Sequence, residues 1–300
     1  MSLLKRYADK LYLKQWSIGF AKHCIAEIIR QKKSNLSIEW LSPESNKFSY
    51  ADPFIFRDKN NELQVLFESV STVGLDGKIT LMNIDEEGKP ISQKTLLETE
   101  AHLSYPFVYS ENDKIYVFPE NAFSGSLFCY EFDADKKTLI NKKEIIRQPV
   151  VDSTIVKHEG KYWLFSTMVG ESRNSDLHIF YADSLTGPYS PHIGNPVKKN
   201  LHSSRPAGNI IEVDGELFRP AQNCTSFYGE SITINKINKL TTSEFEETEH
   251  FVITANKNDK FNYGIHTINF CDNIIIVDGQ KKYFQPIRQL LRKLKNVIKK

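Results

Sequence analysis

The chain has 300 residues, of which 40% are hydrophobic and 25% are charged, a balance typical of a globular protein and unlike that of a disordered one. Its formal net charge of +2 conceals an asymmetry, because residues 281–300 hold 8 Lys/Arg and no acidic residue, leaving 31 basic and 37 acidic residues elsewhere. A mildly acidic body argues against nucleic-acid binding, and the sequence holds no apolar run long enough to span a membrane.

The chain opens without a signal-peptide pattern, and its four cysteines lie far apart, with no CxxC pair and no metal-ligand spacing. This usage predicts reduced thiols, a cytoplasmic location and no metal site. The sequence also lacks a Walker loop and a GxGxxG motif, so we expect no bound cofactor.

The first element expected along the chain is a helix over residues 17–33. Its apolar residues recur at roughly helical spacing: Ile18, Phe20, Ala21, Ile25, Ile28 and Ile29. Residues 1–37 are therefore interpreted as a short helical N-terminal extension.

A repeat then runs to the end of the body. Each copy has an apolar strand, a polar turn and a second, aromatic-rich strand. The copies open at 51–56, 104–109, 152–156, 204–211 and 265–270, a period of roughly 50 residues. Further strand-like runs lie between the copies, so each repeat offers about four strands.

Four strands per repeat and five repeats predict an all-β fold, a five-bladed β-propeller over residues 38–284. Because the innermost strands of a propeller line its channel, the opening residues are expected to converge at one mouth: Asp52, Tyr105, Asp152, Arg205 and His266. A strand at Ile38–Leu41 is a candidate to complete the last blade.

The remaining residues, 285–300, are expected to form a basic amphipathic C-terminal helix. From Pro286 onward, Leu and Ile residues form one stripe opposite a Lys/Arg face. Such a helix can lie peripherally on the inner face of an anionic membrane, or it can pack its stripe on the propeller. The sequence leaves both readings open.

The repeat openings resemble those of a known group. Ala51-Asp52-Pro53 is similar to the first-blade motif of the arabinanase/levansucrase/invertase propellers, which are glycosyl hydrolase family 43-like. The segments ADSLTGPY and NPV, within residues 182–197, look like their blade-closing motif. The set YADPF, HLSYPFV, PEN, DSTIV, SSRPAGN and LFRPAQNC resembles more closely the N-terminal domain of glucosamine inositolphosphorylceramide transferases and its bacterial stand-alone relatives.

The resemblance implies catalytic roles for two aspartates. Hydrolases of this group use a base or nucleophile, a pKa-tuning Asp and a general acid. Asp52 matches the first role and Asp152 the second, but Arg205 stands where the acid is expected. Arginine cannot donate a proton at neutral pH, so the ordinary hydrolase mechanism is incomplete. Glu120 or Glu68 would have to supply a displaced acid.

Around these candidate catalytic residues, Asp52, Asp152 and Glu120, we predict a substrate-binding set: Glu68, Tyr105, His202, Arg205, Arg219, Gln222 and His266. Arginines facing carboxylates favour an anionic ligand such as a nucleotide sugar. Purely structural roles stay open for three of these residues. Asp52 would accept backbone hydrogen bonds in a turn, Arg205 would pair with Asp152, and His266 would be a histidine packed in the core.

Three functions compete on this evidence. The leading hypothesis is glycosyl transfer in cell-envelope glycan or glycolipid biosynthesis, with a sugar, a nucleotide sugar or a lipid-linked glycan as partner. The second is a glycoside hydrolase with a displaced acid, and the third is a non-catalytic glycan-binding module. One propeller scaffold supports all three, so the fold alone cannot choose.

Overall fold

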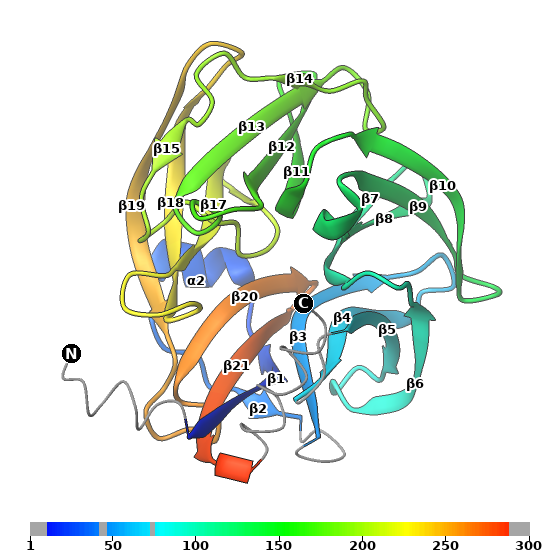
Figure 1. Cartoon of the computed structure of the whole chain (residues 1–300), viewed down its shortest axis with the longest axis vertical. Helices are drawn as coiled ribbons and strands as arrows, with labels where there is room; N and C mark the ends of the chain where they lie inside the picture. The colour runs from blue at the N-terminus through cyan, green and yellow to red at the C-terminus, as the bar shows by residue number, and fades with distance from the viewer. Residues whose placement is uncertain (1–10, 42–46, 73–75, 288–300) are drawn as a thin grey trace.

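Five antiparallel sheets surround a common centre in this computed structural model, which describes residues 11–41, 47–72 and 76–287 (Figure 1). Each sheet is one blade of a five-bladed β-propeller, as the repeat predicts. Within each blade the strands follow one another outward from the centre, so the first strand of each repeat is innermost.

The first three blades each come from one continuous stretch of chain. Blade I contains β3 (Phe48–Arg57), β4 (Leu63–Ser71), β5 (Gly77–Ile84) and β6 (Pro90–Leu97). Blade II contains β7 (Ser104–Glu111), β8 (Lys114–Glu120), β9 (Leu127–Asp133) and β10 (Thr138–Ile146), with a 3-10 turn, η1 (Ala122–Ser124), after β8. Blade III contains β11 (Val150–His158), β12 (Lys161–Met168), β13 (Asp176–Ala182), and two short outer strands, β14 (Ser190–Pro191) and β15 (Lys198–Lys199).

Blade IV is also continuous, whereas blade V joins the two ends of the described chain. Blade IV contains β16 (Ile211–Val213), β17 (Glu216–Asn223), β18 (Ser231–Leu240) and β19 (Phe245–Thr254). Blade V contains β20 (Gly264–Cys271), β21 (Ile274–Phe284), β1 (Tyr12–Lys22) and β2 (Glu39–Trp40), in that order outward.

The N-terminal segment differs from its prediction. Residues 12–22 form strand β1, paired with β21 from Tyr12↔Phe284 to Lys22↔Ile274, and only α2 (Ile25–Gln31) is helical. Ile18 and Phe20 are two residues apart and both buried, a spacing that fits a strand as well as a helix. The predicted boundary at residue 37 therefore divides blade V, while the expected Ile38–Leu41 strand is present as β2.

Strand β21 ends at Phe284, and the boundary at residue 284 stays a prediction. Most of the predicted basic helix, residues 288–300, lies outside the described residues. Within the described part of the chain, no helix has the length and apolar character needed to cross a membrane.

Hydrophobic clusters between adjacent blades hold the ring together. Between blades III and IV, for example, Trp163, Phe165 and Ile179 pack with Leu217 and Ile237, all of them buried. Such burial contributes about 25 cal/mol per Å² of apolar surface removed from water. Because every blade packs on two neighbours, the inner strands are held in fixed positions around the channel.

Candidate functional site

A bulge occurs near the start of the innermost strand in four blades. The pairing register shifts between Ala51 and Phe54, Ser104 and Phe107, Val151 and Thr154, and Ile265 and Ile268. Three residues at these bulges adopt a left-handed backbone: Asp52 (φ 51°), Tyr105 (φ 39°) and Asp152 (φ 52°). This conformation is uncommon for residues other than glycine, and bulges often redirect side chains next to functional sites. We call this end of the channel the mouth.

Carboxylates of one blade bond the bulge of the next. The backbone N–H of Asp52 donates to Asp278 Oδ2 (3.0 Å), that of Tyr105 to Asp52 Oδ2 (3.3 Å), and that of Asp152 to Glu120 Oε2 (2.9 Å). These three bonds join blade V to I, I to II and II to III. The acids therefore satisfy N–H groups that the bulges remove from the strand ladder.

Two sets of hydrogen-bonded charged residues, a first and a second group, lie at the mouth. In the first, His266 lies between two carboxylates, with Nε2 3.1 Å from Asp52 Oδ1 and Nδ1 2.7 Å from Asp278 Oδ2. Burial lowers the pKa of His266, but the charges of Asp278 and Asp52 outweigh it and raise this pKa to about 10. The imidazole is thus held as a cation between two anions.

In the second group, Asp152 Oδ2 accepts hydrogen bonds from Arg205 Nε (2.5 Å) and Gln222 Nε2 (2.7 Å). The ion pair is buried, since the Arg205 and Asp152 side chains are only 10% and 3% exposed. Arg205 also lies over the ring of Tyr228, with its guanidinium carbon 4.9 Å from the centroid. We call Asp52, Asp152, Arg205, His266 and Asp278 the inner ring.

Glu120 lies next to Asp152, from whose backbone N–H it accepts a hydrogen bond, and its pKa differs from the ordinary value of a glutamate. Burial, together with the nearby charge of Asp152, raises the pKa of Glu120 to about 8. Its carboxyl group is therefore mainly protonated at neutral pH and is able to donate a proton.

Asp52, His266 and Asp278 are the three described residues whose ligand atoms gather closely enough, within 4.8 Å, to hold a metal ion. The observed distances fit a protonated imidazole placed between the two carboxylates. The two imidazole nitrogens face different carboxylates, and each N···O distance is that of a direct ion pair. We therefore describe these residues as a charge network.

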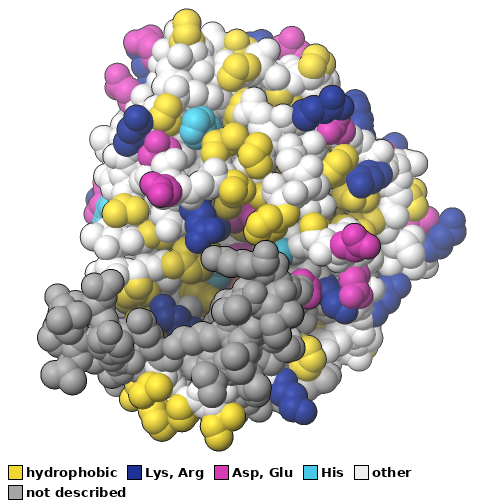
Figure 2. Space-filling view, viewed as in Figure 1, with side chains coloured by type: hydrophobic (Ala, Val, Ile, Leu, Met, Phe, Trp, Pro, Cys, Tyr) yellow, Lys and Arg dark blue, Asp and Glu magenta, His cyan; other side chains and the backbone are white. Residues whose placement is uncertain are grey.

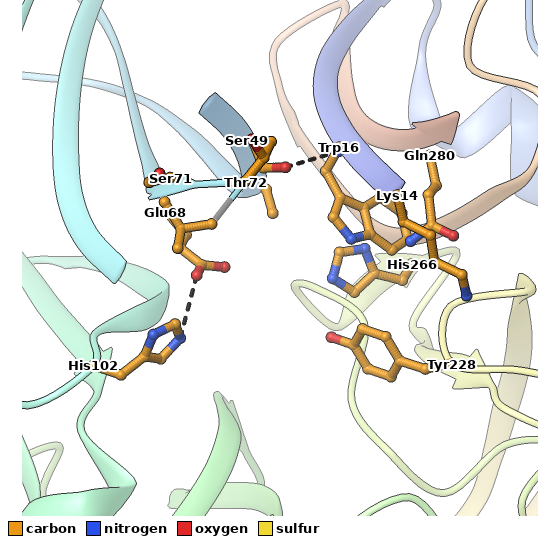
Figure 3. Close-up of a pocket in the computed structure, with 12 residues that line it drawn as sticks. Lys14, Trp16, Ser49, Glu68, Ser71, Thr72, His102, Tyr228, His266 and Gln280 are labelled. Atoms are coloured by element: carbon orange, nitrogen blue, oxygen red, sulfur yellow. Dashed lines mark hydrogen bonds and ion pairs between the residues drawn. The ribbon is translucent and has the colours of Figure 1, made fainter. Parts of the chain in front are cut away.

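An open pocket of about 320 Å³ lies beside the inner ring, between blades I and V. Figure 3 shows two walls that face each other across it, one with Glu68 and His102 and the other with Trp16, His266 and Tyr228. Lys14 and Gln280 extend the second wall. His266 belongs to both the inner ring and the pocket, so it connects them.

The first wall contains a carboxylate–histidine pair. His102 Nε2 is 3.2 Å from Glu68 Oε1, and His102 Nδ1 accepts a hydrogen bond from the Gly77 N–H (2.9 Å). That bond occupies the Nδ1 lone pair, so the ring proton of neutral His102 lies on Nε2 and points at Glu68. Burial raises the pKa of Glu68, against the opposing effect of His102. A Cβ at Gly77 would lie 2.8 Å from Glu68 Oε1 and 2.4 Å from the Leu103 carbonyl, so glycine permits this packing.

The second wall is aromatic. The Trp16 ring lies 4.0 Å from the His266 ring, and Tyr228 meets both rings at their edges. Tyr228 comes from the β17–β18 loop, in which Gly229 has φ 73° and a Cβ would lie 2.7 Å from Trp16. Aromatic faces beside a few polar groups are the usual lining of a small-ligand site, sugar sites included.

Most of the predicted site residues lie at the mouth or in the pocket, but some do not. Asp52, Asp152, Arg205 and His266 lie in the inner ring, in contact with Gln222 and Glu120, and Glu68 lines the pocket. Tyr105 contacts these residues through its backbone N–H, which donates to Asp52. Its hydroxyl bonds Thr154 Oγ1 and the Gly208 N–H, which links three blades and leaves no face for a ligand.

Two predicted binding residues lie outside this group. Arg219 is 1% exposed, and its guanidinium bonds Glu247 (2.6 and 2.8 Å) and two backbone carbonyls in blade IV. His202 pairs with Glu249 on the outer strand of the same blade (2.7 Å). Both predictions therefore need correction, because these side chains are paired with acidic residues of β19 and do not line the pocket.

Sequence reasoning missed Trp16, His102, Tyr228 and Asp278. His102 was within reach, because it opens the HLSYPFV motif. Asp278 follows a strand that the repeat identified. Trp16 and Tyr228 gave no comparable signal, since one precedes the repeats and the other lies in an irregular loop.

The fold defines the class: a five-bladed propeller like those of family 43 glycoside hydrolases. A thermostable family 43 hydrolase superimposes with a TM-score of 0.56 at 15% identity, over 71% of this chain and 81% of its own. A family 117 hydrolase from Zobellia galactanivorans matches with the same TM-score at 11% identity, over 92% of each chain. At these identities the likeness establishes the fold alone.

The sequence identifies the family. Residues 39–270 match the family described as glucosamine inositolphosphorylceramide transferase 1, N-terminal, and this chain belongs to it. Glucosamine inositolphosphorylceramide transferase 1 from Arabidopsis thaliana is 32% identical over 246 residues, and the enzyme of that name from Oryza sativa subsp. japonica is 32% identical over 203. These spans cover 77% and 66% of this chain but only 32% and 27% of the plant proteins. Trp16, Lys14 and Gln280 lie outside residues 39–270, which the family model matches.

Proposed function

We propose that the chain is a carbohydrate-active protein of glycan or glycolipid biosynthesis. In this proposal the pocket beside the inner ring binds the sugar that accepts a glycosyl group, with a nucleotide sugar or a lipid-linked glycan as its partner. The supporting observation is the Glu68–His102 pair facing Trp16 and Tyr228 across an open pocket. The plant relatives are named as transferases acting on glucosamine and inositolphosphorylceramide, which supports the same chemistry.

Glu68 is the proposed base. Glycosyl transfer requires removal of a proton from the accepting hydroxyl, and a carboxylate whose pKa is raised by burial accepts that proton more readily. His102 Nε2–H holds one carboxylate oxygen, leaving the other to face the hydroxyl. The aromatic wall would bind the apolar face of the sugar.

The inner ring argues against ordinary hydrolysis. Asp52 and Asp152 match the carboxylates of the hydrolase group, yet each is paired with a buried cation, His266 or Arg205. Arg205 occupies the position of the general acid and cannot donate a proton at neutral pH. In the proposed function these residues shape the mouth and do not react.

A second candidate is hydrolysis with Glu120 as a displaced acid, favoured by its pKa of about 8. It predicts release of free sugar from aryl glycosides or oligosaccharides, with activity abolished in Glu120→Gln. A glycan-binding module without turnover would show binding but neither activity. The cytoplasmic location expected from the sequence stays a prediction.

The test is ligand-induced stabilisation of the full chain. Glucosamine, N-acetylglucosamine, inositol phosphate and a panel of nucleotide sugars would be screened by the shift in thermal midpoint, because a ligand of the native state raises it by mass action. We expect Glu68→Gln and Tyr228→Ala to weaken binding of the active ligand about tenfold or more.

Glu216→Gln is the matched control, since this carboxylate pairs with Lys236 on blade IV, away from the pocket. Equal binding by Glu68→Gln and the control would rule out the pocket. Binding that depends on Glu68 without any transfer to an acceptor sugar would select the binding-module alternative.

A further inference from the structure

The exposed apolar side chains are distributed unequally between the faces of the propeller. Among the described residues, ten large hydrophobic side chains are exposed, and seven of them lie at the mouth end of the strands, on what we call the mouth face. They are Leu11, Phe48, Phe123, Val169, Leu201, Phe284 and Ile287. Phe123 and Ile287 are 78% and 74% exposed. Figure 2 looks onto this face and shows hydrophobic side chains around a central hollow.

Strand order assigns these residues to one face. The mouth contains the beginnings of the innermost strands and the ends of the second strands, because the two run antiparallel. Phe123 follows β8, Val169 follows β12, and Phe284 ends β21, and all three are second strands. Leu201 joins this group because its carbonyl accepts a hydrogen bond from the Cys224 N–H, directly after β17.

The opposite face has a different composition. Its turns join first to second strands at residues 58–62, 112–113, 159–160, 214–215 and 272–273, and they are rich in Asp, Glu, Asn and Gly. None of the ten exposed hydrophobics of the described chain lies in these turns. The other three lie along outer blade edges: Ile91 and Ile140 are in the outermost strands of blades I and II, and Ile193, 82% exposed, is in the turn after β14.

Basic residues accompany the apolar tips. Lys14, Lys281 and Lys282 lie on the two blade V strands that reach the mouth, and Arg147, which is paired with Glu144, precedes blade III with 84% of its side chain exposed.

We infer that the mouth face binds an anionic lipid surface, with Phe123, Val169 and Leu201 inserted among the headgroups. Apolar tips on a face that also carries lysines suit such an interface, because apolar burial and attraction to anionic lipid add together. The tips are separate loops and form no single groove for a partner helix. The pocket opens on the same face, so it would meet lipid headgroups directly. This inference holds whether or not the pocket catalyses transfer.

Vesicle sedimentation tests the inference with the full chain. Vesicles of phosphatidylcholine alone are compared with vesicles that also contain phosphatidylglycerol. We expect binding to the anionic vesicles that weakens as salt increases, and a loss of about tenfold in the variant Phe123→Ser/Val169→Ser/Leu201→Ser. The matched control is Ile91→Ser/Ile140→Ser/Ile193→Ser, which removes as many exposed apolar side chains from the blade edges and should bind normally.

A second measurement protects against a misfolded variant. Tryptophan introduced as Phe123→Trp should be quenched by brominated lipid, whereas Ile140→Trp should not. The inference is overturned by an absence of vesicle binding, by equal losses in the two triple variants, or by equal quenching at positions 123 and 140. A mouth face that instead mediates self-association, seen as a larger mass by light scattering that the first variant abolishes, would identify a protein interface and also overturn it.

Discussion

The inner ring and the adjacent pocket share His266 but differ in how their charges are used. In the inner ring each carboxylate is paired with a buried cation and also accepts backbone hydrogen bonds or a side-chain amide bond. In the pocket, Glu68 faces open space and has one histidine partner. Asp52 therefore helps to hold neighbouring blades together, as does Asp152, while Glu68 lines an open pocket.

The largest loss of stability is expected for a substitution in the inner ring. Asp152→Ala removes the anion that neutralises buried Arg205 and the acceptor of Gln222, and should lower the free energy of unfolding by about 3–5 kcal/mol. Urea denaturation measures this loss. Asp183→Ala, which breaks an exposed pair with Lys161, should change stability little. Similar small losses in both variants would contradict a structural role for the inner ring.

The next effect is a pH dependence of stability. The pKa of His266 is raised to about 10 in the folded chain, above its ordinary value of 6.5, so folding favours the protonated form. Its stabilisation is complete below pH 6.5 and is lost as the pH rises through 10, with a slope of at most ~1.4 kcal/mol per pH unit. Denaturation across this range should show the decline. His266→Gln should flatten it, and an unchanged slope would disprove the cationic imidazole.

The smallest effect on stability is expected in the pocket. Glu68→Gln keeps the acceptor for His102 and removes a carboxyl whose pKa is raised by burial, so stability at neutral pH should stay within about 1 kcal/mol or increase. Glu247→Gln is the contrasting buried carboxylate. Burial opposes ionisation of Glu247, yet Arg219 lowers its pKa, so losing this charge should destabilise the fold. If Glu68→Gln lowered the free energy of unfolding more than Glu247→Gln does, the assignment of Glu68 to the pocket and of Glu247 to the structural acids would be wrong.

The repeat made most of the fold predictable from sequence. Strand, turn and strand are local patterns, and five copies at a regular spacing specify a ring of blades. The convergence of Asp52, Asp152, Arg205 and His266 follows from that ring. The ring closure was harder, because β1 pairs with a strand more than 250 residues away and its apolar spacing also fits a helix.

Side-chain direction explains the errors at the site. Arg219 and Gln222 are three residues apart on β17, so they point to opposite faces of the strand and only one of them can reach Asp152. Arg219 instead meets Glu247 of β19. Tyr105 was correctly placed at the mouth, but its ring direction depends on contacts with Thr154 and Gly208 that come from other blades.

The placement of Trp16 on β1 connects folding to recognition. β1 supplies the third strand of blade V, and Trp16 and Lys14 on this strand form part of the pocket wall. A chain with four formed blades and an unpaired N-terminal strand would retain much of the core but lack that wall. Incompletely assembled molecules would therefore lack the complete pocket, so pairing of the strand that closes the ring also completes the candidate binding site.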